Sequence, residues 1–223
     1  MKITWFGHDN FLIEGSKTII FDPWFSGNPS SPLKVSEVKK IDAALVTHDH
    51  GDHGYADAVT LCKRDNANFI GIFELSNKAK EDGVEKTVGG NIGGTVMTAD
   101  GLKVAITQAF HSSSSGTPVG LIVMLDGHRI YHPGDTGVFG DMKLIARLFK
   151  PDIVFLPIGG WFTMDVEGAL LAIELLNPRI VIPMHYGTFP ILEKDATKFV
   201  EAVAEKFPST TCLVLEIGQE VTI

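Results

Sequence analysis

The chain has 223 residues, of which 44% are hydrophobic and 21% charged, and this suits one soluble α/β domain over residues 1–223 better than two. A formal net charge of −8 argues against a broad nucleic-acid-binding surface, so we expect no nucleic-acid partner. No apolar run approaches the roughly 20 residues of a membrane span.

The two cysteines, Cys62 and Cys212, belong to no CxxC or CxxH pattern, so neither is expected to bind a metal. Both are interpreted as core thiols, which fits a reducing compartment. The first residues lack the apolar segment of a signal peptide. A cytoplasmic protein is therefore expected.

Three short runs rich in β-branched and aromatic residues indicate strands near the N-terminus. Gly15-Ser16 separates the second run from the third as a hairpin turn. The segment 22–32 is dense in Pro, Gly and Ser and is predicted to be a loop. The nearly all-apolar run 43–47 is typical of a strand covered on both faces. The three N-terminal runs are residues 2–6, 11–15 and 17–21.

Strands and helices follow in alternation after residue 54, and Asp126-Gly127 favours a hairpin turn between two of the strands. Two sheets packed face to face, with helices outside, would accommodate this order. The predicted helices are 55–66, 74–82, 165–176 and 192–206. The predicted strands are 68–73, 95–99, 102–109, 119–125, 128–132, 152–157, 179–184, 212–217 and 219–223.

A cluster of metal-binding residue types follows the strand 43–47. His48 and His50 are two apart in extended chain, so both imidazoles can face one cation. Gly51 has no side chain and lets the backbone turn, so that Asp52 and His53 can face a second point. Since a protein metal site uses three or more protein ligands, this pattern requires further ligands elsewhere in the chain.

Three later residues meet that requirement. His111, Asp135 and His185 each stand where a predicted strand meets a loop. Loops carried by a rigid scaffold are where binding and catalytic residues concentrate. Three such residues together with the HxHxDH spacing are a strong signal for a metal centre.

The HxHxDH segment, His48 to His53, resembles the hallmark of the metallo-β-lactamase superfamily, and the resemblance covers essentially the whole chain. The segments WFGHDNF, FDPWFSGNP, HPGDT, GGWFTM and MHYGTFP are similar to a branch of uncharacterised metal-dependent hydrolases. That branch is related to ascorbate phosphate lactonases and to phospholipase D enzymes acting on N-acyl phosphatidylethanolamine. The resemblance implies a four-layer αββα sandwich, and it leaves room for a homo-oligomer.

The same resemblance implies a binuclear metal site at one rim of the strands. In it, one metal is held by His48, His50 and His111, the other by Asp52, His53 and His185, and Asp135 bridges the two. Imidazole and carboxylate ligands without thiolate suit two divalent ions drawn from Zn, Mn, Ni and Fe. Their charge would exceed that of the carboxylates and a bridging hydroxide, which favours a small anionic substrate.

Metal ions lower the pKa of bound water toward about 7, so we expect hydrolysis of a phosphodiester, a phosphorylated lactone or another ester-type bond. Asp135 and Asp52 are the expected catalytic carboxylates. The alternative is a metal-dependent ligand-binding or sensor protein on the same fold without turnover, because ligands alone do not reveal rates.

Other polar residues have two interpretations each. His8 is a catalytic candidate that would orient substrate or support a ligand, or else it is a hydrogen-bonded turn histidine. Asp49 either contacts a metal ligand or lies on the surface. Asp22 is interpreted as a loop-capping residue in preference to a partner of a ligand histidine. For His132 we expect a packing role, and for His128 an exposed position after the turn.

The serines 112–115 are interpreted as a flexible loop beside His111 and not as nucleophiles, since no paired base motif accompanies them. Asp165 and Glu167 are explained by the start of a helix. Trp161 either forms an aromatic wall near the substrate or fills the core. Substrate contacts are predicted in three loops, 24–36, 112–118 and 159–164.

Overall fold

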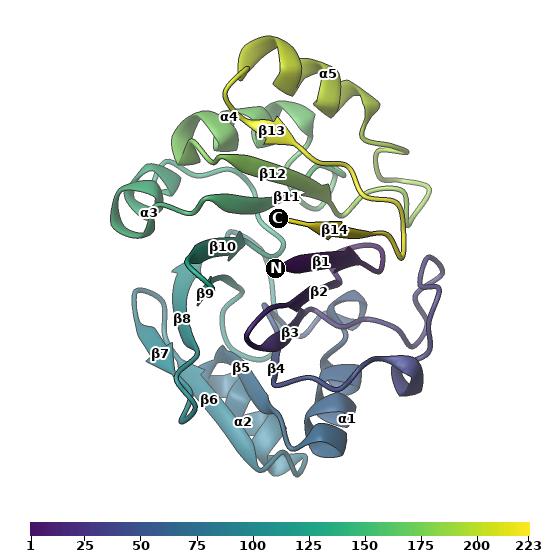
Figure 1. Ribbon diagram of the computed structural model, residues 1–223, viewed down its shortest axis with the longest axis vertical. Coiled ribbons are helices and arrows are strands. Elements are labelled where there is room, and N and C mark those ends of the chain that lie inside the picture. Colours follow the sequence, from purple (N-terminus) through teal and green to yellow (C-terminus); the bar gives the residue numbers. More distant parts are fainter.

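Two seven-stranded sheets pack face to face in the computed structural model, which describes residues 1–223 (Figure 1). The first sheet has the order β14 (Glu220–Thr222), β1 (Lys2–Trp5), β2 (Phe11–Glu14), β3 (Thr18–Phe21), β4 (Ala43–Leu45), β5 (Asn68–Ile72) and β6 (Lys86–Gly90). The second has the order β13 (Thr211–Cys212), β12 (Ile180–Met184), β11 (Ile153–Pro157), β10 (His128–His132), β9 (Val119–Leu125), β8 (Lys103–Gln108) and β7 (Thr95–Met97).

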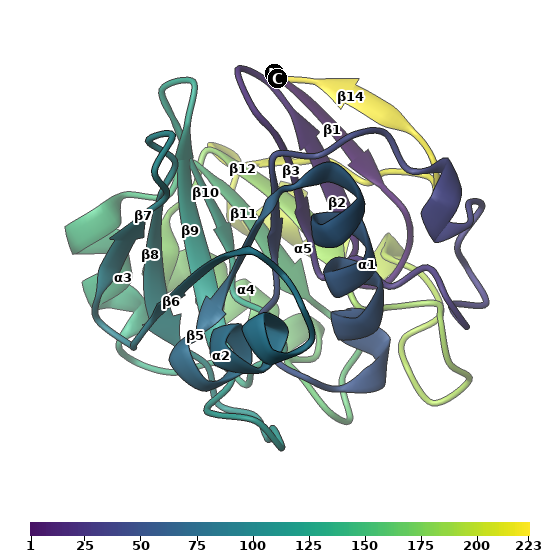
Figure 2. The same ribbon diagram turned by 90° about the horizontal axis from the view of Figure 1, so that it is seen from below.

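Helices cover the outer face of each sheet. Figures 1 and 2 show α1 (Tyr55–Asp65) and α2 (Phe73–Glu81) beside the first sheet. On the other side lie α3 (Met142–Phe149), α4 (Val166–Leu176) and α5 (Thr197–Lys206), next to the second sheet. This layering confirms the αββα sandwich expected from the sequence. None of these helices combines the length and the apolar character needed to cross a membrane.

The directions of the strands bring several strand ends to one rim. In the first sheet β1, β3 and β4 run the same way, because β2 lies antiparallel between β1 and β3, and β4 is parallel to β3. In the second sheet β8, β10, β11 and β12 also share one direction. The carboxyl ends of like-directed strands meet at one edge of a sheet. Segments that follow these strands therefore gather together.

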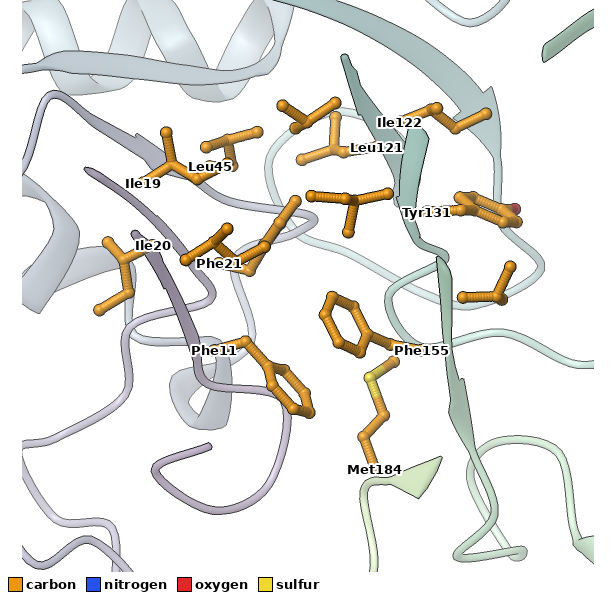
Figure 3. Packing of buried hydrophobic residues seen from close by; sticks show 14 of the residues in the cluster. Phe11, Ile19, Ile20, Phe21, Leu45, Leu121, Ile122, Tyr131, Phe155 and Met184 are labelled. Atoms are coloured by element: carbon orange, nitrogen blue, oxygen red, sulfur yellow. The ribbon is translucent and has the colours of Figure 1, made fainter. Parts of the chain in front are cut away.

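Aliphatic and aromatic side chains together fill the space between the sheets (Figure 3). Phe11 of β2 stacks on Phe155 of β11 with ring centroids 4.1 Å apart, and both rings are fully buried. Phe21 of β3 stacks on the imidazole of His132 at 4.9 Å. These contacts join strands of opposite sheets directly below the rim. The core therefore also fixes how the strand ends of the two sheets face each other.

The hairpin predicted at Asp126-Gly127 is confirmed. Leu125 pairs with His128, so the turn has two residues, and both have positive φ, 51° and 83°. This backbone matches the right-handed twist of paired strands and suits Asp followed by Gly. The core thiol expected at Cys62 is also confirmed, since the residue is buried in α1 and burial raises its pKa to about 12. Cys212 lies in β13 and is only half-buried.

Four differences separate the predicted elements from the fold. Neither β6 nor α3 was expected. The strand pattern of β6 is weak because the strand ends in two glycines. The helix predicted over 192–206 begins only at Thr197, whose amide bonds to the Asp195 carboxylate. The strand predicted over 212–217 ends at Cys212, because the chain then crosses to the first sheet, where the Gly218 amide donates to the Trp5 carbonyl.

Replacing Phe155 by Ala should lower the free energy of unfolding by about 3–5 kcal/mol, because the change opens a cavity between the sheets. Leu148→Ala on α3, where the side chain is 72% exposed, is the matched control and should change it by less than about 0.5 kcal/mol. Urea unfolding followed by circular dichroism measures both. Equal effects of the two changes would contradict the proposed packing.

Candidate metal centre

Three imidazoles converge at the end of β4. His48 Nε2 lies 3.0 Å from His50 Nδ1, which in turn lies 3.2 Å from Nε2 of His111. The first two rings lie side by side with centroids 4.6 Å apart, as their spacing predicts, and His111 arrives from the end of β8 on the other sheet. The three nitrogens form one group that could hold a cation.

A second group lies beside the first and combines four residues. Its members are His8, Asp52, His53 and His185. Each offers one oxygen or nitrogen atom, and these four atoms all lie within 4.8 Å of one another. His8 Nε2 is 3.4 Å from Asp52 Oδ2, and the His8 ring centroid is 4.0 Å from that of His185. His8 is fully buried, and its Nδ1 lies 3.0 Å from the Thr188 hydroxyl oxygen.

Asp135 stands between the two groups. Its Oδ1 is 3.4 Å from His53 Nε2, and its Oδ2 is 3.4 Å from His111 Nε2 and 3.2 Å from His185 Nε2. The side chain follows β10 and is almost completely buried. All seven residues predicted from the sequence as metal ligands therefore lie in one cluster at the common rim.

The backbone requires glycine at position 54, directly after the HxHxDH segment, and not at the predicted position 51. Gly51 begins a 3₁₀ turn, η2 (Gly51–His53), and a Cβ added there would meet nothing within 4 Å. Gly54 has φ of 68°, and a Cβ there would lie 2.3 Å from the carbonyl carbon of Pro23. The close approach of the 22–26 loop therefore requires glycine at 54 and leaves 51 free.

Asp22 is a partner of a histidine in the centre and not merely a loop cap, contrary to expectation. Its carboxylate accepts bonds from the amide and hydroxyl of Thr47, at 2.8 and 2.7 Å. Oδ2 also lies 2.9 Å from His53 Nδ1. A carboxylate on Nδ1 fixes the proton there and leaves Nε2 free to bind a cation.

The side chain of Asp49 is largely buried, and its Oδ2 lies 3.9 Å from Lys78 Nζ. Its Oδ1 accepts bonds from the Ser113 hydroxyl at 2.9 Å and from the Ser114 amide at 2.8 Å. These bonds tie the serine loop to the HxHxDH segment. Neither interpretation from the sequence, a surface residue or a partner of a metal ligand, describes this role.

The remaining candidates are placed as follows. His132 packs as expected, and its Nδ1 also accepts a bond from the Gly134 amide in the Asp135 loop. His128 is half-buried and not simply exposed, because its Nδ1 lies 2.7 Å from an oxygen of Asp152. Asp165 caps α4 by accepting the Gly168 amide, and Glu167 lies in its first turn. Trp161 is 76% exposed, which excludes the core interpretation.

Asp9 was missed in the sequence, although it follows β1 at the same rim. It is fully buried, and neither carboxylate oxygen has a hydrogen-bond partner. Oδ2 lies 3.9 Å from His53 Nδ1, and Asp9 forms a further group with Asp135 and His185. Burial raises the pKa of Asp9 well above its usual range. The rule that located His111 and His185 at strand ends would also have located this carboxylate.

A recess of about 210 Å³ opens beside His50. Trp24, Ser26 and Tyr55 are among the residues that line it. Asp57 of α1 holds the recess wall, because its carboxylate accepts bonds from the amides of Phe25 and Ser26 at 2.8 and 2.7 Å. Part of the predicted substrate loop 24–36 thus borders the centre.

Charges in the cluster are strongly coupled. Burial lowers the pKa of His185, but the carboxylates of Asp135 and Asp9 outweigh burial and raise it to about 9. Burial raises the pKa of Asp135, yet His53 and His185 reverse this and hold it well below its usual range. Burial lowers the pKa of His8 to about 4. The pocket thus favours positive charge next to Asp135.

The residues present fit divalent cations. The orphaned buried atoms include His53 Nε2 and Asp135 Oδ1, neither of which has a hydrogen-bond partner although both lie in the cluster. Leaving such groups unpaired costs stability, so an arrangement of this kind calls for a further partner. Imidazole and carboxylate donors suit Zn, Mn, Fe or Ni.

The folded-state pKa of His185, about 9, lies above its ordinary value of 6.5. Its proton therefore contributes stability that is fully present below pH 6.5 and is lost as pH rises through about 9. We expect metal-free protein to lose stability over this window. Urea unfolding at several pH values measures the loss, which should be smaller in His185→Gln. An identical pH profile in the variant would contradict the shift.

Comparisons with known proteins agree with this geometry. A family model described as "Beta-lactamase superfamily domain" matches residues 2–185. A UPF0173 metal-dependent hydrolase of Korarchaeum cryptofilum is 47% identical over 219 residues, covering 98% of both chains. Another of Archaeoglobus fulgidus is 47% identical over 229 residues, covering 98% of this chain and 97% of that one.

Among solved structures, the chain is similar to Igni18, described as a novel metallo hydrolase from the hyperthermophilic archaeon Ignicoccus hospitalis. The TM-score is 0.92 at 40% sequence identity, and the match covers 100% of this chain and 97% of that one. The likeness therefore extends over the whole chain.

Proposed function

Because the chain belongs to the UPF0173 metal-dependent hydrolases of the metallo-β-lactamase superfamily, we propose that it hydrolyses a small anionic molecule at a binuclear metal centre. The observation that carries the proposal is the position of Asp135. Its two carboxylate oxygens contact histidines of both groups, at 3.2–3.4 Å. One carboxylate can thereby serve two cations.

In this proposal the first cation is held by His48, His50 and His111, and the second by Asp52, His53 and His185, with Asp135 shared. Two divalent cations would supply an activated water and polarise the bond to be broken. The chain's own residues set the protonation states. Asp22 keeps the proton of His53 on Nδ1, and Asp135 draws the ring nitrogens of His111 and His185 toward one point.

His8 orients the carboxylate of Asp52 in this scheme. Its low pKa keeps the ring neutral at neutral pH, and its Nδ1 lies 3.0 Å from the Thr188 hydroxyl oxygen. In the tautomer with hydrogen on Nε2, this nitrogen faces Asp52 Oδ2 at 3.4 Å. His8 thus acts through Asp52, as a positioning residue.

Phosphodiesters and phosphorylated lactones are the first substrate classes to test, followed by other esters. Positive charge at the floor of the centre favours an anionic group there. The alternative is a metal-dependent binding or sensor protein without turnover. Metal binding without hydrolysis of any phosphodiester, lactone or thioester in a panel, together with a co-purifying metabolite, would favour that alternative.

Asp135→Asn should abolish the shared ligand while keeping the side-chain volume. After reconstitution with Zn²⁺ or Mn²⁺, we expect less than one equivalent of bound metal by elemental analysis. Hydrolysis of any substrate of the unaltered protein should fall by more than about 100-fold, because loss of a residue that only orients a metal ligand already costs about 10- to 100-fold. Asp126→Asn, in the β9–β10 turn, is the matched control. Unchanged metal content and rate in Asp135→Asn would overturn the binuclear assignment.

Asp22→Asn should weaken metal binding by about 10- to 100-fold, because the amide no longer fixes the proton of His53 on Nδ1. Competition with a chromophoric chelator measures the affinity. Asp42→Asn is the control, since its carboxylate accepts the Thr18 amide at the other end of the same strands. If both variants bind metal equally well, Asp22 serves the loop and not the centre.

A further inference from the structure

Three large aromatic side chains on two loops that are bonded to the Asp135 loop lie open to solvent. Phe110 is 63% exposed, Trp161 76% and Phe162 54%, in a chain whose other large aromatics are mostly buried. We call these three residues the aromatic rim. Exposed apolar groups that gather at one place mark a binding surface more often than scattered ones do.

Hydrogen bonds join the rim to the centre. Thr136, which directly follows Asp135, is fully buried. Its hydroxyl accepts a bond from the Phe110 amide at 2.9 Å, and its carbonyl accepts one from the Met164 amide at 3.0 Å. Phe110 precedes His111. The loops that carry the rim are thus bonded to the loop that carries Asp135, so the rim keeps a fixed position relative to the centre.

The loop 159–164 is shaped by its contact with His185. A Cβ at Gly159 would lie 2.0 Å from the His185 carbonyl oxygen, so only glycine fits there. Trp161 follows with φ of 59°, a conformation that bulky residues rarely adopt. The fold therefore keeps the Trp161 ring exposed, two residues after the Gly159 contact with His185, at a cost in backbone strain, as is found at ligand-binding segments.

Resting on the proposed function, we propose that the substrate carries an aromatic or similarly flat apolar group next to its anionic group. The anionic group occupies the centre, and the apolar group lies on the aromatic rim. A polar floor bordered by apolar walls is the usual make-up of a small-molecule site. Since rim and centre share their loops, one molecule reaches both, and this continuity favours a substrate over a second copy of the chain.

Two ligands that differ only in the apolar group test the inference on zinc-loaded protein with its metal content measured. Phenylphosphonate should bind about tenfold more tightly than methylphosphonate in isothermal titration, because the ring is removed from water. Trp161→Ala should reduce this preference to less than about threefold. It should leave the affinity for methylphosphonate and the bound metal unchanged. Leu148→Ala, equally exposed but distant on α3, should keep the full preference.

Three other outcomes are possible, and each contradicts a specific part of the proposal. Equal affinities of the two ligands for the unaltered protein would overturn the inference and leave the binuclear centre intact. Failure of both ligands to bind to fully loaded protein would overturn the anion site of the proposed function, and the inference with it. Dimerisation in sedimentation experiments that disappears in Trp161→Ala would show that the rim binds a second copy instead.

Discussion

The whole centre depends on one buried carboxylate placed where two sheets meet. Asp135 comes from β10 of the second sheet, yet His53, one of its partners, comes from the first. Removing a carboxylate from water is costly unless positive charge compensates it. The two imidazole groups supply part of that charge, and divalent cations would supply more. Any change in how the sheets pack would therefore alter the electrostatics as well as the distances.

The surrounding residues divide into those that fix ligand orientation and those that fix charge. Asp22 and Asp49 are bonded to amides and hydroxyls, so they hold backbone and rings in place. Asp9 is different, because its oxygens have no hydrogen-bond partner and it lies among His53, His185 and Asp135. Burial raises the pKa of this carboxyl well above its usual range, so it holds a proton more readily than Asp135 does. Its Oδ2 lies 3.9 Å from His53 Nδ1, which is beyond hydrogen-bond distance of this proposed ligand.

The sequence predicted which residues gather at the rim, because strand direction is a strong constraint. Once His48 and His50 follow a buried strand, other ligands must follow strands that end at the same rim, and His111, Asp135 and His185 do. The spacing says nothing, however, about which glycine the turn needs, because that depends on Pro23 approaching Gly54 from a distant segment. For the same reason, Asp22 was interpreted as a loop cap: its bond to His53 joins residues 31 positions apart.

The elements that the sequence missed lie where local pattern and tertiary contact disagree. The last strand of the second sheet stops at Cys212 although apolar residues continue, because the chain must leave to pair as β14 with β1. That crossing brings the C-terminus back beside the N-terminus, where the Ile223 amide donates to the Met1 carbonyl. The edge strand β14 thereby covers β1, whose end carries His8 and Asp9 to the rim. A segment far from the centre thus stabilises the strand that delivers two of its buried polar residues.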